Sequence, residues 1–221
     1  MPSIGFIGGT GDLGTALAVQ LSANHESVTI GSRSSEKAKS AVRTILEEKS
    51  RRGYLLNHLK AGSNREVVST CDLVILTVPH EKAIQTIKEL SNDFRGTQVL
   101  VSAVAVLSKI GSQFFPSSSE SVAKQIRSLL PPSVEVASAF QTLPATMLYE
   151  EREISADVLV SAESVQTYEK VAKLISSMRG LRPLYLGDLE LAGELERLTA
   201  LLLNLATRNG LKSPTLKISS F

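Results

Sequence analysis

Short runs of β-branched and aliphatic residues alternate with longer amphipathic segments along the whole 221-residue chain. The runs are almost continuously apolar, as expected of strands that are buried on both faces, whereas the longer segments have their apolar residues at helical spacing. The expected strands are residues 4–7, 27–30, 73–78, 98–104, 134–140, 157–162 and 183–187, with a weaker one near 55–61. The expected helices lie near residues 12–23, 35–49, 64–70, 81–91, 119–130, 164–179 and 189–208. This alternation predicts an α/β protein: a doubly wound, mostly parallel sheet of Rossmann type with helices on both faces.

The last expected helix differs from the others because leucine dominates it. Its leucines recur at helical spacing, at positions 191, 195, 198, 202 and 205. A helix this apolar is expected to be buried on most of its sides, either in the core or against a second subunit, or to line a pocket with its end near residue 210. We therefore expect a main domain over residues 1–187 and a small helical C-terminal subdomain over residues 188–221.

A glycine-rich turn follows the first expected strand directly. The stretch "IGFIGGTGDLG" matches the pattern G-x-G-x-x-G with Gly9, Gly11 and Gly14, and an amphipathic helix begins at once. In a strand–turn–helix unit these glycines allow a tight turn, a close approach of the backbone to a pyrophosphate, and close packing of helix on strand. The helix start also offers free N–H groups to phosphate oxygens. This context predicts a dinucleotide site, although a merely tight turn has the same pattern.

The residues after the second strand indicate which dinucleotide is bound. A site for NAD usually has Asp or Glu there, about 20 residues beyond the glycines. This chain instead has Ser32 and Arg33, with Lys37 one helical turn later. A hydroxyl and two cations suit the extra phosphate of NADP, and charge-assisted bonds of about 1.5–3 kcal/mol each would favour NADP by at least ~100-fold. The alternative is a solvated basic helix start, which would oppose the helix dipole.

Composition excludes several other classes of protein. The formal net charge of +2 is too small to indicate a nucleic-acid partner. The N-terminal residues lack the pattern of a secretory signal, and no apolar run is long enough to cross a bilayer. One cysteine suits a reducing compartment, and the three histidines are too far apart in sequence to suggest a metal site. We therefore expect a cytoplasmic protein with no metal, no membrane attachment and small-molecule ligands.

With these residues in view, the chain resembles the NADPH-dependent coenzyme F420 reductases, the F420H2:NADP oxidoreductases. The resemblance covers nearly the whole chain. It rests on "GGTGDLG", "IGSRSSEKA", "CDLVILTVPHEKAI", "LPA" at 143–145, and "GLRPLYLGDLELAGELERLTALLLNLATRNG". The last of these stretches is the most specific, because very many dehydrogenases share the glycine turn. The resemblance implies an enzyme that transfers a hydride between NADP(H) and the deazaflavin coenzyme F420.

The family pattern also implies cofactor contacts at particular positions. For the pyrophosphate these are the glycine turn and the residues that start the helix: Gly9, Thr10, Gly11, Asp12, Leu13 and Gly14. The 2′-phosphate would contact Ser32, Arg33 and Lys37. The turn after the "LVILTV" strand, with Thr77, Val78, Pro79 and His80, would lie near the adenine and its ribose, and Ala145 near the nicotinamide. For His80 itself, a polar loop role and a general-acid role stay open.

The deazaflavin is expected where the strands of a parallel sheet end, since ligands of doubly wound folds bind there. Candidate contacts are Ala103, Val104, Gln141, Gly210 and Leu211. Hydride transfer needs two rings face to face and water excluded, which fits a chain without an obvious acid–base pair. The chain departs from the family here, with Gln141 in place of a histidine and "SAVAVLSK" (102–109) in place of a proline-containing loop.

The alternatives to an F420-dependent enzyme are an NADPH-dependent reductase of flavin, ferric chelate or a small imine, or an NADP-binding redox sensor. A homodimer through the leucine-rich helix is also expected, because its apolar surface needs cover.

Overall fold

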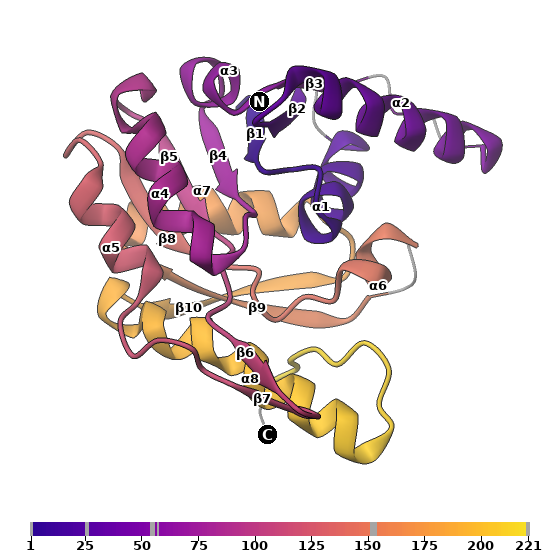
Figure 1. Ribbon diagram of the computed structural model, residues 1–221, viewed down its shortest axis with the longest axis vertical. Helices are drawn as coiled ribbons and strands as arrows, with labels where there is room; N and C mark the ends of the chain where they lie inside the picture. Colours follow the sequence, from indigo (N-terminus) through magenta and orange to yellow (C-terminus); the bar gives the residue numbers. More distant parts are fainter. Residues whose placement is uncertain (1, 25–26, 54–55, 57, 151–153, 220–221) are drawn as a thin grey trace.

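The computed structural model describes residues 2–24, 27–53, 56, 58–150 and 154–219 (Figure 1). Within these residues eight strands form one sheet in the order β10-β9-β8-β5-β4-β1-β2-β3. These strands are β1 Ile4–Ile7, β2 Val28–Ser32, β3 Leu59–Ser63, β4 Leu73–Leu76, β5 Val99–Ser102, β8 Glu135–Ser138, β9 Ala156–Ala162 and β10 Leu181–Gly187. The main helices are α1 Asp12–Ser22, α2 Ser35–Arg51, α3 Asn64–Thr70, α4 His80–Leu90, α5 Val122–Leu129, α6 Ala145–Tyr149, α7 Val165–Ser176 and α8 Ala192–Asn209. The predicted doubly wound α/β fold is confirmed.

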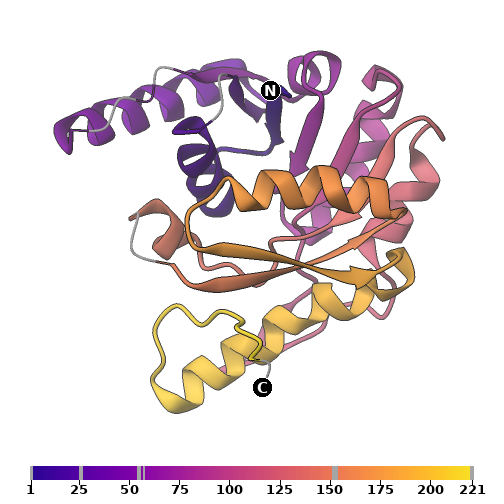
Figure 2. The same cartoon turned by 180° about the vertical axis from the view of Figure 1, so that it is seen from behind.

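The sheet has helices on both faces, and its strands bury side chains on both. Phe6 and Ile75 face a core shared with α1, α2, α6 and α7, whereas the alternate residues Ile7 and Leu76 face α3, α4 and α5. Figure 2 shows α7 lying across the first of these faces. Successive side chains of each strand point to opposite faces of the sheet, and both faces are covered by helices. The strand sequences are therefore unbroken apolar runs.

The chain reverses direction at the last two strands. β8 pairs antiparallel with β9, and β10 runs parallel to β9, so both outer strands oppose the rest. β8 and β9 pair only through Ala137–Ala162 and Ser138–Ser161. The amino-terminal half of β9 therefore extends past the carboxyl end of β8 and forms a wall beyond the edge where the parallel strands end.

Two elements were not expected from the sequence. A hairpin of β6 (Ser108–Ile110) and β7 (Gln113–Phe115) lies along α8 (Figure 1), and Asn204 of α8 bonds both backbone groups of Phe114. The short helix α6 follows Pro144. Both lie inside connections that lack a long periodic pattern, so sequence periodicity gave no signal for them. The weak strand expected near 55–61 is found as β3, although residues 55 and 57 lie outside the described part of the chain.

Within one chain the leucine-rich helix is only half buried, so the chain's own core covers one side of it, and cover of the other side by a second subunit stays a prediction. Leu195 and Ala200 pack into the fold, but the side chains of Leu201 and Leu205 are 56% and 45% exposed. The reason is that α8 runs past the sheet, and its second half has the hairpin and the C-terminal segment beside it (Figure 2).

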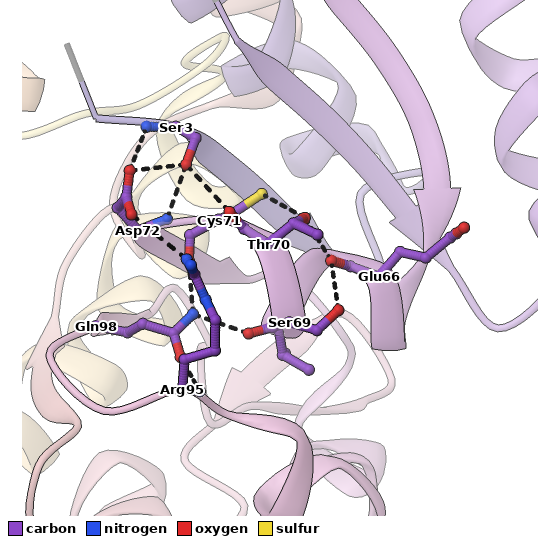
Figure 3. A network of polar contacts seen from close by, with 9 residues as sticks. Ser3, Glu66, Ser69, Thr70, Cys71, Asp72, Arg95 and Gln98 are labelled. Carbon is purple, nitrogen blue, oxygen red and sulfur yellow. Dashed lines mark hydrogen bonds and ion pairs between the residues drawn. The ribbon is translucent and has the colours of Figure 1, made fainter.

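A polar network holds together the end of the sheet at which the parallel strands β1, β4 and β5 begin (Figure 3). Ser3 and Asp72 exchange hydrogen bonds, with Ser3 N donating to Asp72 Oδ2 at 2.9 Å and Asp72 N donating to Ser3 Oγ at 3.0 Å. Arg95 pairs with the same carboxylate, and Gln98 donates to the carbonyl oxygens of Val68 and Cys71. The hydrogen bonds from Ser3 lower the pKa of Asp72. This network joins β1, β4 and β5 at the end remote from the glycine turn, so it is structural.

Candidate functional site

The glycine turn connects β1 to α1 as the pattern predicts. Gly8 has φ +70°, a conformation that glycine adopts without strain, and its N–H donates to Asn64 Oδ1 at 3.1 Å. Gly9 N donates to the carbonyl oxygen of Gly31, which ties the turn to the end of β2. Gly11 is the N-cap of α1, and no side chain of the described residues caps this helix. Its first N–H groups are therefore available to an anion.

Close packing explains the third glycine of the motif. A Cβ at Gly14 would lie 2.7 Å from Gly9 Cα and 2.6 Å from Thr77 Oγ1. Thr77 in turn donates to the carbonyl oxygen of Ile7, which holds the turn after β4 against β1. The helix thus approaches the turns after β1 and β4 more closely than any larger residue would allow.

A cavity of about 480 Å³ lies beside this turn at the carboxyl ends of the parallel strands. Its lining includes most of the positions expected to hold the cofactor: Thr10, Gly11, Ser32, Arg33, Lys37, Thr77, Val78 and Pro79. Arg33 follows β2 directly, and Ser34 caps α2 by accepting from Lys37 N, which places Lys37 in the first turn of α2. Backbone N–H groups, hydroxyls and cations around one cavity fit a dinucleotide with an additional phosphate.

The same cavity has lining residues that sequence reasoning missed. Asn64 follows β3, and four residues of α4 complete the wall: Lys82, Gln85, Thr86 and Glu89. These four recur at spacings of three or four, so they form one polar face of α4. That spacing was visible in the sequence once a helix was placed after Pro79. Asn64 was hidden because the strand before it contains lysine and glycine and gave only a weak signal.

His80 is the first residue of α4, but its ring does not line the cavity. Its Nε2 atom lies 2.8 Å from Ser117 Oγ and its Nδ1 atom 3.4 Å from Glu81 Oε1. These contacts join the turn after β4 to the segment that follows the hairpin. They favour the polar loop role over a direct contact with the cofactor.

Ala145 lines a second cavity, of about 360 Å³, together with Asp12 of α1. The helix that begins at Ala145 is fixed at its far end by two side chains. Gln20 donates to the carbonyl oxygen of Leu148 at 2.7 Å, and the buried Lys49 donates to that of Tyr149 at 2.6 Å. Burial and the bond to Glu48 raise the pKa of Tyr149 to about 12. α1 and α2 therefore hold α6, and with it Ala145, in place.

The residues expected to contact the acceptor are mostly buried. Ala103 and Val104 belong to the core, and Gln141 is only 5% exposed. Gln141 Nε2 donates to Ser102 O at 3.0 Å and to Ser138 Oγ at 2.8 Å, so it joins the ends of β5 and β8. Phe140 precedes it with φ +78°, a left-handed conformation that is strained for a bulky residue and turns the chain at this point.

Two residues of α8 fasten this helix over the region. The buried Glu196 accepts from Ser121 Oγ, Val122 N and Ala123 N, so it caps α5, and burial raises its pKa. Thr199 donates to the carbonyl oxygen of Gln141 at 2.8 Å. Gly210 ends the helix in the left-handed conformation, and both Gly210 and Leu211 are exposed.

The segment after α8 returns to the sheet. Ser213 Oγ lies 3.1 Å from Thr146 Oγ1 of α6. Further on, Asp157 N of β9 donates to Leu216 O, and Ile218 N donates to the fully buried Asp157 carboxylate at 2.6 Å. Arg182 binds that carboxylate with two bonds, of 2.8 and 2.7 Å. The C-terminal segment thus pairs with the part of β9 that extends past β8.

The doubly wound sheet, the glycine turn and the cationic cavity beside it define a Rossmann-type dinucleotide-binding protein. Residues 3–106 match the protein family described as "NADP oxidoreductase coenzyme F420-dependent". The F420-dependent NADP reductase of Methanothermobacter thermautotrophicus is 31% identical over 98% of this chain and 94% of its own length. That of Methanocaldococcus jannaschii is 31% identical over 98% of both chains. The chain therefore belongs to the family of F420-dependent NADP reductases.

A solved structure supports the same fold. A crystal structure of a protein from Arthrobacter sp. FB24 superposes with a TM-score of 0.80. The superposition covers 100% of both chains at 20% sequence identity. At this identity the comparison shows the fold alone, over the full length of both chains.

Proposed function

We propose that this protein transfers a hydride between NADP(H) and coenzyme F420. The observation that carries the proposal is the nearly full-length similarity to enzymes named F420-dependent NADP reductases. The cavity with Arg33 and Lys37 supports the NADP half, because these side chains can bind a 2′-phosphate. The proposed reaction moves a hydride between the two rings, and the deazaflavin takes up one proton with the hydride when it is reduced.

The roles of the chain's own residues follow from their places. N–H groups of Gly11, Asp12 and Leu13 bind the pyrophosphate, and Ser32, Arg33 and Lys37 bind the 2′-phosphate. Ala145, held by α6, orients the nicotinamide, since a small side chain leaves room for a ring to approach. The bound pair of cofactors supplies the redox chemistry itself. The protein positions the two rings and excludes water from the space between them.

The acceptor side is formed by the ends of β5 and β8 and by the C-terminal subdomain. We assign Ala103, Val104, Gln141, Gly210 and Leu211 to the walls of the acceptor site. Gln141 acts by holding together the ends of β5 and β8. Residues 188–221 close the cleft over the main domain of residues 1–187. The bonds from Thr199 to Gln141 and from Ser213 to Thr146 support this closing role.

The proposal predicts that the purified protein reduces coenzyme F420 with NADPH. The measurement is the loss of the acceptor's absorbance band: the deazaflavin band with coenzyme F420, and then the flavin band with free flavin in its place. We expect bleaching of F420 and little or none of flavin. Bleaching of flavin alone would indicate a different acceptor, and bleaching of neither, despite tight NADPH binding, would favour a redox sensor.

We further propose a homodimer that works in the cytoplasm. Leu201 and Leu205 are exposed one helical turn apart on α8, an apolar surface that a second subunit would cover. Within the described residues, no helix has both the length and the hydrophobicity that a membrane crossing requires.

The dimer proposal predicts that Leu201→Glu produces monomers, because a charge cannot be buried unpaired in such an interface. Sedimentation velocity of the wild-type protein and of the variant measures this. Val165→Glu, at an equally exposed valine on α7, is the matched control and should stay dimeric. A wild-type protein that sediments as a monomer at micromolar concentration would contradict the proposal.

A further inference from the structure

Asn64 occupies a position that connects three parts of the cofactor cavity. It is the first residue of α3 and directly follows β3. β2 and β3 are paired in register, with Ser32 opposite Ser63, so Asn64 lies beside Arg33 where the two strands end. Its side chain is 6% exposed and lines the 480 Å³ cavity. A polar residue this buried at a ligand cavity needs an explanation for each of its polar atoms.

One half of the side-chain amide has a clear partner. Asn64 Oδ1 accepts from the N–H of Gly8, which holds the first residue of the glycine turn across 56 positions of sequence. To reach Gly8 the side chain passes Gly31. A Cβ at Gly31 would lie 3.1 Å from Asn64 Oδ1 and 2.5 Å from Phe6 O, so only glycine leaves room there. The carboxamide is thereby fixed in one orientation.

The other half has no partner. Nδ2 carries two donors, and no hydrogen bond to it occurs within the part of the chain that the structure describes. The fully buried side-chain atoms that lack partners, among these residues, are Ser102 Oγ, Gln141 Oε1 and Thr215 Oγ1. Because Asn64 Nδ2 is not one of them, it is accessible from the cavity. Its donors therefore face the space lined by Ser32, Arg33 and Lys37.

We propose that Asn64 is a positioning and specificity residue for the nucleotide: its Oδ1 holds the glycine turn, and its Nδ2 donates to the 2′-phosphorylated ribose of NADP(H). The proposal rests on the proposed function only in taking NADP(H) as the ligand. A neutral donor beside Arg33 adds a directed hydrogen bond where the arginine adds charge. Asn64 also couples the pyrophosphate site to the ribose site, because the same side chain fixes the glycine turn and contacts the ribose.

The test is binding of adenosine 2′,5′-bisphosphate to the full chain, which involves no hydride acceptor and so can succeed or fail independently of the enzyme assay. Asn64→Asp keeps an oxygen for Gly8 and replaces the donors by a charged acceptor. By calorimetry we expect it to weaken the binding of the bisphosphate and of NADPH by the same factor, about tenfold or more. Ser69→Ala, on the exposed side of α3, is the matched control and should bind as the wild type does.

A second measurement covers the case in which the variant folds poorly. In the wild-type protein the side-chain amide resonances of Asn64 should shift when the bisphosphate is added, and should not shift when adenosine is added. Unchanged resonances at saturation would overturn the proposal. So would an Asn64→Asp protein that binds the bisphosphate as tightly as the wild type, because the side chain would then serve Gly8 alone.

Discussion

Replacing Arg33 by alanine is expected to weaken NADPH binding by about 100-fold while changing NADH binding by less than about threefold. The guanidinium group can form two charge-assisted bonds with a 2′-phosphate, each worth about 1.5–3 kcal/mol, and NADH has no phosphate there. Arg33 lines the cavity beside Lys37, and no ion pair of Arg33 occurs within the described residues. Fluorescence titration of both reduced cofactors measures the ratio directly.

Lys39→Ala is the appropriate control for this variant. Lys39 is on the same helix as Lys37, but it does not line the cavity and instead pairs with Glu36 at 2.9 Å on the surface. Lys39→Ala removes one positive charge, as Arg33→Ala does, and it should leave the ratio of NADPH affinity to NADH affinity unchanged. If Arg33→Ala weakened both cofactors equally, the arginine would serve the fold of the turn and the phosphate assignment would be wrong.

The second large effect is expected at Asp157. Asp157→Asn removes the charge from a fully buried carboxylate that accepts from Arg182, Lys217 and Ile218 N. Breaking such a pair costs about 3 kcal/mol or more, which should lower Tm by roughly 6–12 °C for a chain of this size. The C-terminal segment loses its attachment to β9 at the same time. Thermal unfolding followed by circular dichroism measures the loss.

The pH dependence of this effect has a definite sign. The bonds from Arg182 hold the pKa of Asp157 well below its ordinary value, despite the opposing effect of burial. The stabilisation is therefore complete above the unfolded-state pKa, near 3.9, and is lost as the pH falls through that value toward the folded-state pKa. The difference in stability between the wild type and Asp157→Asn should be constant from about pH 7 to pH 5 and should shrink below about pH 4.

Asp72→Asn serves as the control for the measurements of stability at acidic pH. Asp72 also has a lowered pKa, but its side chain is 56% exposed in the network of Figure 3, so the substitution should cost less than about 1 kcal/mol. A stability difference for Asp157→Asn that stayed the same from pH 7 to pH 3 would contradict the assignment of a charged carboxylate in the folded state.

Most helices and strands could be predicted because their signals are local. The bounds of β1 and α3 agree with the sequence prediction, and the other predicted elements differ by a few residues at their ends. The reversal of β9 was not predictable, since an apolar run has the same pattern in either direction. Leucine spacing likewise indicates which face of α8 is apolar, but not whether the chain's own core or a second subunit covers it.

The site divides in the same way. Gly9, Gly11, Gly14, Ser32 and Arg33 could be placed from spacing alone, because a strand–turn–helix unit fixes where each of them points. Gln141 could be located at the end of β8, but not the inward direction of its side chain, which depends on Ser102 and Ser138. Lys82 could have been predicted as a site residue from the polar face of α4. Asn64 could be placed at the site only once the register of β2 and β3 was known.

By itself, the sequence determined the layered α/β fold, the turn that accepts a pyrophosphate, and the cationic residues in place of an acid after β2. These features depend on neighbours within about one strand–turn–helix unit, where sterics and periodicity leave few choices. Only the tertiary structure decided that Asn64 reaches Gly8, that Asp157 anchors the C-terminal segment, and that α8 leaves Leu201 uncovered. Each of these depends on residues far apart in the chain, and their meeting is set by strand order, register and the packing of side chains, which no local pattern encodes.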